Sequence, residues 1–118
     1  NPDFVPNREF TQGEIKDAYI FLFYVDWCPY SKKAKPIWEQ IKAKFNNKEI
    51  NNVKLHFNEI DGEKEDKALE NFEKEYLSPN DKKIDGYPSI WLVKGDQVIE
   101  FDAKPDKNSL TEFINAVL

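Results

Sequence analysis

The sequence predicts a single α/β domain over residues 1–118, with a central mixed β-sheet flanked by α-helices. Apolar runs rich in β-branched and aromatic residues, typical of strands, alternate with amphipathic stretches typical of helices. The early strands are separated by helices, which predicts parallel pairing, whereas the last two flank the short turn 94–96, which predicts an antiparallel hairpin. A chain of 118 residues is long enough to bury a core without disulfide or metal support.

The first residues are expected to form an irregular arm or a short edge strand around Phe4 and Val5. Thr11 and Glu14 have the spacing of a capping box, in which each side chain bonds to the other residue's backbone N–H. This spacing predicts a short helix from about Gln12 to Asp17.

The segment from Ala18 to Val25 is continuously apolar, which is typical of a strand buried on both faces. A helix is predicted from Pro29 to Phe45, because proline suits the first helical position and because apolar residues recur at spacings of three and four. Those apolar residues are Ala34, Ile37, Trp38, Ile41 and Phe45. The apolar period continues past Pro36, so we expect one bent helix instead of two.

The middle of the chain alternates apolar and polar residues from Val53 to Ile60, which predicts a strand with one well-buried face. Asp61-Gly62 is a predicted turn, and the highly charged segment from Glu63 to Tyr76 is a predicted amphipathic helix. The proline- and asparagine-containing stretch from Leu77 to Asp85 is expected to be a long polar loop.

The last part of the chain predicts two strands and a helix. Ile90–Val93 is a strand, and Lys94-Gly95-Asp96 turns the chain into a half-exposed edge strand, Gln97–Phe101. Asp106 is placed to cap a final helix. The apolar residues expected on its buried face are Leu110, Phe113, Ile114 and Val117.

Charge and hydropathy exclude several classes of partner. The net charge is −5, the pI is about 4.9 and the two signs are interspersed, so no basic patch is available for nucleic acid. The longest apolar run is far shorter than the ~20 residues that span a bilayer, so we expect a soluble monomer without a membrane partner. Localisation is not readable from the sequence; of the two compartments, we favour the cytoplasm over a secretory lumen.

Cys28, the only cysteine, lies between a predicted strand and a predicted helix. The first-turn N–H groups of a helix lack partners and carry partial positive charge, which stabilises a thiolate. Cysteines in such places have pKa values of about 3.5–7.5 instead of about 8.5. Lys32 and Lys33 in the first turn add positive charge. We therefore expect a nucleophilic Cys28 in place of an ordinary buried thiol, and no metal site, because no His or Cys cluster accompanies it.

Four motifs in this order and spacing resemble the thioredoxin family over nearly the whole chain. They are Trp27-Cys28-Pro29-Tyr30 after a buried strand, Pro36 in the following helix, Gly86-Tyr87-Pro88 before the penultimate strand, and the Lys94-Gly95-Asp96 hairpin. A Cys-x-x-Cys motif near a βαβ unit is typical of this family.

The resemblance implies a thioredoxin fold and a protein-disulfide oxidoreductase. It implies that Cys28 is the nucleophile, that Pro88 is a cis proline facing it, and that the backbone of Tyr87 pairs with an extended substrate peptide. Trp27, Pro29 and Tyr30 are implied to border the thiol and contact the substrate. The implied partners are disulfide-containing proteins or peptides, with no bound cofactor and with an external thiol such as glutathione, or a thiol reductase, as electron donor.

The sequence departs from the family pattern at the site itself. Ser31 occupies the position of the resolving cysteine, which releases the substrate from a mixed disulfide. Leu22 stands where a buried carboxylate usually assists proton transfer, and the loop from Leu77 to Lys83 is longer than expected. Because the surroundings match a dithiol site, we favour an engineered cysteine-to-serine replacement at Ser31. The alternatives are a natural monothiol, glutathione-dependent (glutaredoxin-like) enzyme and a non-enzymatic peptide-binding module.

Overall fold

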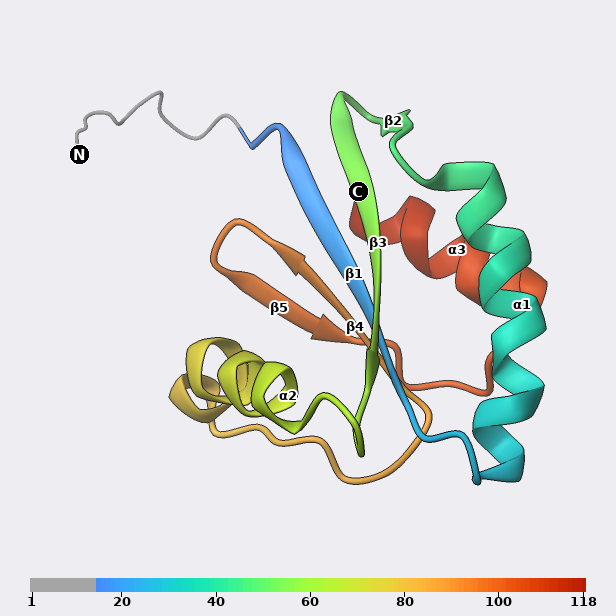
Figure 1. The fold of residues 1–118 in the computed structure, drawn as a ribbon. Coiled ribbons are helices and arrows are strands. Elements are labelled where there is room, and N and C mark those ends of the chain that lie inside the picture. The colour runs from blue at the N-terminus through green and yellow to red at the C-terminus, as the bar shows by residue number, and fades with distance from the viewer. Residues whose placement is uncertain (1–14) are drawn as a thin grey trace.

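The computed structural model describes residues 15–118, which form a five-stranded sheet with helices on both faces (Figure 1). The strands are β1 (Asp17–Tyr24), β2 (Glu49–Ile50), β3 (Val53–Asp61), β4 (Ser89–Lys94) and β5 (Gln97–Glu100). The helices are α1 (Pro29–Phe45), α2 (Asp66–Phe72), the π-helical turn η1 (Glu73–Leu77), the 3-10 turn η2 (Ser78–Asn80) and α3 (Lys107–Val117). This arrangement confirms the predicted mixed sheet flanked by helices.

The sheet has the strand order β2-β3-β1-β4-β5, with β1 at its centre. β1 runs parallel to β3, whereas β1 with β4, β4 with β5 and β2 with β3 pair antiparallel. Gly95 has a φ of +63° in the turn between β4 and β5, a conformation that glycine adopts at little cost. The parallel crossover and the final hairpin were both predicted.

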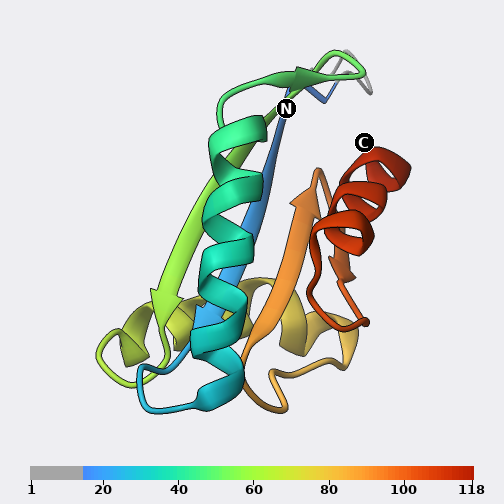
Figure 2. The same cartoon turned by 90° about the vertical axis from the view of Figure 1, so that its right-hand side faces the viewer.

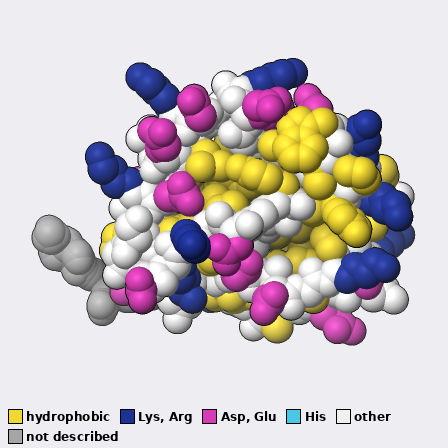
Figure 3. Space-filling model, turned by 90° about the horizontal axis from the view of Figure 1, so that it is seen from below, with side chains coloured by type: hydrophobic (Ala, Val, Ile, Leu, Met, Phe, Trp, Pro, Cys, Tyr) yellow, Lys and Arg dark blue, Asp and Glu magenta, His cyan; other side chains and the backbone are white. Residues whose placement is uncertain are grey.

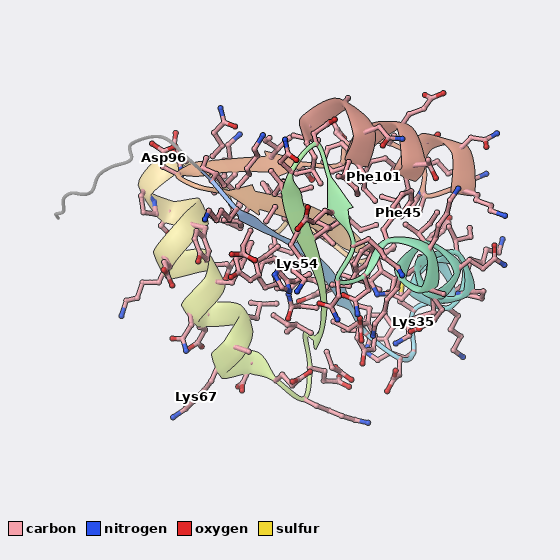
Figure 4. The ribbon with its side chains drawn as sticks, turned by 90° about the horizontal axis from the view of Figure 1, so that it is seen from above. Lys35, Phe45, Lys54, Lys67, Asp96 and Phe101 are labelled. Atoms are coloured by element: carbon pink, nitrogen blue, oxygen red, sulfur yellow. The ribbon has the colours of Figure 1, made fainter. Side chains whose placement is uncertain are left out.

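Two hydrophobic cores lie on opposite faces of the sheet. The larger core lies between the sheet and helices α1 and α3, where Figure 4 shows Phe45 and Phe101. The smaller core lies on the opposite face, where Phe72 of α2 packs on Phe23 and Trp91 joins the same cluster. Figure 2 shows α1 and α3 side by side over one face of the sheet. β1 is buried from both sides in its second half, as its apolar sequence predicts, although Tyr19 is exposed.

Helix α1 begins and ends where the sequence predicts. Pro29 occupies the first helical position and Asn46 ends the helix in an extended conformation. Pro36 is exposed and lies inside one continuous helix, so the predicted single helix is confirmed.

The second helix is shorter than predicted and ends differently. The carboxylate of Asp61 accepts hydrogen bonds from the N–H groups of Glu63 (2.9 Å) and Lys64 (3.1 Å), so the chain turns there and α2 begins only at Asp66. Its end widens into the π-helical turn η1, which an amphipathic period does not predict. The predicted loop after it begins with the short turn η2.

Two further predictions differ from the structure near the sheet edges. The predicted helix from Gln12 to Asp17 is wrong for residues 15–17, because Lys16 and Asp17 are extended by pairing with β3, where Lys54 N–H donates to the Lys16 carbonyl (2.8 Å). The capping box and the strand at Phe4 lie outside the described residues. The two-residue strand β2 was not predicted. No helix within residues 15–118 is long and apolar enough to cross a bilayer.

Candidate active site

Cys28 lies at the end of the sheet where β1 stops and α1 starts, beside the segment that precedes β4 (Figure 1). It is the N-cap residue of α1, and its N–H donates to the Val25 carbonyl (3.2 Å) in a tight turn. Its thiol donates a hydrogen bond to the main-chain carbonyl of Tyr87, with a sulfur–oxygen distance of 3.7 Å. The structure therefore brings together two predicted site residues that are 59 positions apart.

The start of α1 lowers the pKa of the Cys28 thiol. The largest cause is the hydrogen bond from the Ser31 backbone N–H, which stabilises the thiolate and outweighs the opposing effect of burial. The Tyr30 N–H and the Ser31 hydroxyl add to the lowering. The amide groups of the first turn thus provide the electrostatic effect expected from the sequence, and Cys28 is 9% exposed.

Ser31 is buried at 1% exposure and has a structural role as well as an electrostatic one. Its Oγ accepts a hydrogen bond from the Val25 N–H at 3.3 Å, just beyond the end of β1. This hydrogen bond links the segment between β1 and α1 to the first turn of α1. A side chain at position 31 is therefore enclosed by protein and lies within hydrogen-bond reach of the Cys28 sulfur.

The segment before β4 carries Tyr87 and Pro88, joined by a cis peptide bond. The Tyr87 ring packs closely over Gly62, where a β-carbon would come within 2.6 Å of its Cε1 atom, so only glycine leaves room for the ring. The same segment is held upstream by a hydrogen bond from the Ile84 N–H to the Glu73 carboxylate (3.3 Å). Contacts from η1 and from the β3–α2 turn therefore hold the segment whose Tyr87 carbonyl faces Cys28.

Two aromatic side chains flank the thiol and are open to solvent. Trp27 is 65% exposed and Tyr30 is 70% exposed, while Pro29 between them is also exposed. The exposure of Trp27 agrees with the sequence prediction. Figure 3 views this end of the molecule and shows an extended hydrophobic surface bordered by lysine and acidic side chains. Large exposed apolar surfaces of this kind mark sites of interaction.

A half-buried carboxylate lies between α1 and β3, although not at the position that the family pattern suggested. Leu22 is fully buried, and Glu59 on β3 instead accepts hydrogen bonds from Trp38 Nε1 (2.9 Å) and Lys42 Nζ (3.2 Å). Burial alone would raise the pKa of Glu59, but these hydrogen bonds and the Lys42 charge hold it below its usual value. Because both of its oxygens are engaged, Glu59 serves to join α1 to β3.

Metal ligation finds no support in this part of the chain. Within residues 15–118, no group of three or more His, Cys, Asp or Glu side chains is arranged to hold a metal ion.

A model of the thioredoxin family matches residues 5–116. The chain belongs to the thioredoxin family. Among similar proteins, this thioredoxin domain is 27% identical to the mouse protein disulfide-isomerase TMX3 over 112 residues, 94% of this chain and 22% of that protein. It is 26% identical over 107 residues to a Drosophila melanogaster thioredoxin domain-containing protein 5 homolog, 88% of this chain and 23% of that protein. The chain thus spans between a fifth and a quarter of the length of these relatives.

Solved structures share the fold of this thioredoxin domain. The first thioredoxin domain of mouse protein disulfide-isomerase A4 has a TM-score of 0.62 and 22% identity, over 86% of this chain and 64% of that one. Human ERp44 has a TM-score of 0.61 and 22% identity, over 85% of this chain and 27% of that one.

Sequence reasoning missed two features of the thioredoxin domain's site. One is the hydrogen bond between Ser31 and Val25, which the strand-to-helix spacing does not reveal. The other is a groove beside Tyr30 with lysines at positions 33 and 104. The lysine-rich outer face of α1 was visible in the sequence, but only the fold shows that position 104 lies opposite it.

Proposed function

We propose that this domain performs thiol–disulfide exchange on polypeptide disulfides through Cys28, and that the chain by itself stops at the mixed disulfide. The observation that carries the proposal is the placement of the Cys28 sulfur at the start of α1, against the Tyr87 carbonyl and between exposed Trp27 and Tyr30. Hydrogen bonds from the Ser31 and Tyr30 N–H groups lower the pKa of Cys28, which raises the thiolate fraction near neutral pH. Membership of the thioredoxin family supports the reaction class.

The proposed step is a nucleophilic displacement at sulfur. The Cys28 thiolate attacks one sulfur of a substrate disulfide, a new sulfur–sulfur bond forms, and the other sulfur leaves as a thiolate that takes up a proton from solvent. The Tyr87 backbone is proposed to hold the substrate segment in an extended conformation. No net oxidation occurs, because one disulfide replaces another.

Release of the substrate needs a second thiol, and Ser31 cannot supply one. An external thiol, such as glutathione or the thiol of a reductase, is proposed to attack the Cys28 sulfur of the mixed disulfide, so that the substrate leaves as a thiol. A second external thiol then attacks the disulfide left at Cys28, which returns Cys28 to the reduced form and releases an external disulfide. Our hypothesis that Ser31 replaces a cysteine stays a prediction. A cysteine there would lie in the same enclosed position next to Cys28.

Turnover of a disulfide substrate with dithiothreitol tests the proposal, with the present chain compared with Ser31→Cys. We expect Ser31→Cys to turn over faster than the present chain. Incubated with the substrate and no external thiol, the present chain should accumulate a mixed disulfide at Cys28, detected by intact mass. Cys28→Ser is the matched control and should do neither. Equal turnover by the present chain and Ser31→Cys would contradict the role given to position 31.

A second candidate is a monothiol enzyme that removes glutathione from proteins with Ser31 as its native residue. The hydrogen bond that Ser31 accepts from Val25 favours this reading, because a hydroxyl oxygen is a better acceptor than a thiol. Deglutathionylation by the present chain with glutathione as the only reductant would support the monothiol hypothesis. The absence of activity in that assay would refute it.

A peptide-binding module without redox chemistry would use the same surface and leave Cys28 unreactive. The alkylation rate of Cys28 against pH separates this reading from the other two. An apparent pKa near the ordinary value of about 8.5 would favour the module.

A further inference from the structure

A groove of about 430 Å³ runs from the candidate active site along the first half of α1. Tyr30, Tyr87 and Pro88 line the end nearest Cys28. Farther along, the groove is lined by Ile37 of α1 and by Phe101, the residue that follows β5. Its walls are mostly apolar, and it is continuous with the residues that surround the thiol.

The charged residues lining the groove are both lysines. Lys33 comes from α1 and Lys104 from the loop between β5 and α3, and both are exposed. Among the described residues, neither forms an ion pair, although Lys104 lies near enough to Asp106 to lower the pKa of that carboxyl. The Asp106 carboxylate is occupied as the cap of α3, where it accepts from the Ser109 N–H at 2.8 Å.

The positive charge of this side contrasts with the charge of the whole protein. Helix α1 contains five lysines and one glutamate, a net charge of +4, in a chain whose net charge is −5. Figure 3 shows both lysine and acidic side chains around the hydrophobic surface at this end, but the charged residues that line the groove itself are the two lysines. Complementary occupants carry an apolar side chain and a negative charge close together.

We propose that this groove selects disulfide substrates in which a large apolar residue and an acidic residue lie next to each other, close to the reacting cysteine. The apolar side chain packs between Ile37 and Phe101, and the carboxylate pairs with Lys33 or Lys104. This specificity rests on the proposed exchange reaction at Cys28 and adds a substrate class to it.

The size of the effect follows from the exposure of the two lysines. An exposed ion pair changes an equilibrium or rate by roughly 2- to 5-fold at low salt, and salt screens it. With both lysines available, we expect a peptide with aspartate next to the apolar residue to react roughly 5-fold faster than one with lysine there. We expect this ratio to fall toward one at high salt.

The test uses short peptides whose single cysteine is joined by a disulfide to 5-thio-2-nitrobenzoate. Attack by Cys28 releases this coloured thiolate, so its absorbance gives the rate at which the peptide is captured. Four peptides place Leu-Asp, Leu-Lys, Ser-Asp or Ser-Lys next to the cysteine, and a second set places the pair on its other side. We expect the Leu-Asp peptide of one set to react fastest.

Charge reversal at the groove provides the matched comparison. The double substitution Lys33→Glu with Lys104→Glu should reverse the preference between Asp and Lys peptides, whereas Lys44→Glu in the last turn of α1 should keep it. All three sites are exposed, so the variants should fold, and the salt dependence of the unsubstituted chain tests the same point without any substitution.

The outcomes separate this inference from the proposed function. Capture of all peptides at equal rates, or the same Asp preference in the charge-reversed variant, would overturn the groove's specificity and leave exchange at Cys28 standing. Capture of none of the peptides would refute exchange at Cys28, and the specificity that rests on it.

Discussion

Replacing Ser31 with alanine removes one hydroxyl from the space between β1 and α1. That hydroxyl accepts the Val25 N–H at 3.3 Å and is 1% exposed, so water cannot readily take its place. A buried backbone N–H without a partner costs about 1–3 kcal/mol. Alanine in the first turn of the helix returns about 0.5 kcal/mol through its higher helix propensity.

The net loss in the free energy of unfolding is therefore about 0.5–2.5 kcal/mol. For a chain of this size, that loss corresponds to a fall in Tm of about 2–10 °C. The same substitution should raise the pKa of Cys28, because the Ser31 hydroxyl helps to stabilise the thiolate. The rise should be partial, because the Ser31 backbone N–H is the larger cause of the lowering and survives the substitution.

Urea denaturation followed by tryptophan fluorescence measures the first effect, and the rate of Cys28 alkylation against pH measures the second. Ser78→Ala is the control, because Ser78 is exposed and its replacement should change stability by less than about 0.5 kcal/mol. If Ser31→Ala were as stable as the parent chain and Cys28 titrated unchanged, position 31 would have neither of the roles derived from its contacts.

Three further substitutions test contacts around the site. Glu59→Gln should make the free energy of unfolding fall less steeply as the pH is lowered. The folded-state pKa of Glu59 is lowered, so its ionised form stabilises the fold above the unfolded-state pKa of about 4.3, and this contribution is lost as pH falls through the folded-state pKa. Urea midpoints at pH 6 and pH 3 measure this change, and the exposed Glu39→Gln should keep the parent's profile. Gly62→Ala should displace the Tyr87 ring and cost about 1–3 kcal/mol, with shifted Tyr87 ring resonances in NMR spectra; unchanged resonances would contradict the close packing. Asp106→Ala should cost about 1 kcal/mol in urea denaturation through loss of the α3 cap, and an unchanged midpoint would show that the cap is dispensable.

Local signals in the sequence predicted most of the fold. Helix α1 begins at Pro29, because proline suits the first helical position, and the chain leaves the helix at Asn46. Asp106 caps α3 through its side chain, as its position before the apolar period indicated. These features depend on neighbouring residues alone, and such residues are fully visible in a sequence.

Features that depend on distant partners were harder to predict. The strand β2 is defined only by its pairing with β3, although the turn between them, Asn51-Asn52, has positive φ at both residues and is of a kind that asparagine tolerates. The start of α2 was misplaced because the Asp61 carboxylate binds the N–H groups that an earlier helix start would use. A turn residue that competes with a helix in this way has no periodic signature.

The sequence predicted residues for the candidate site but not the contacts among them. The strand-to-helix junction indicated a reactive Cys28 from local chemistry, and the resemblance to thioredoxins indicated Tyr87 as its neighbour. The hydrogen bond from the Val25 N–H to Ser31 and the position of Lys33 and Lys104 along the same groove arise from tertiary packing. No spacing in the sequence relates these positions.

Cys28 is only 9% exposed, and its neighbours in the sequence, Trp27 and Tyr30, carry large exposed aromatic side chains. Displacement at sulfur requires the attacking atom, the attacked sulfur and the departing sulfur to approach a straight line. With so little of Cys28 accessible, few directions of approach satisfy that alignment. A disulfide flush with a rigid protein surface would be held away by the flanking rings, whereas one on a projecting or loosened segment could reach the thiol. For the proposed exchange reaction, steric access to Cys28 would thus discriminate between compact and partly unfolded substrates before any side chain of the substrate is recognised.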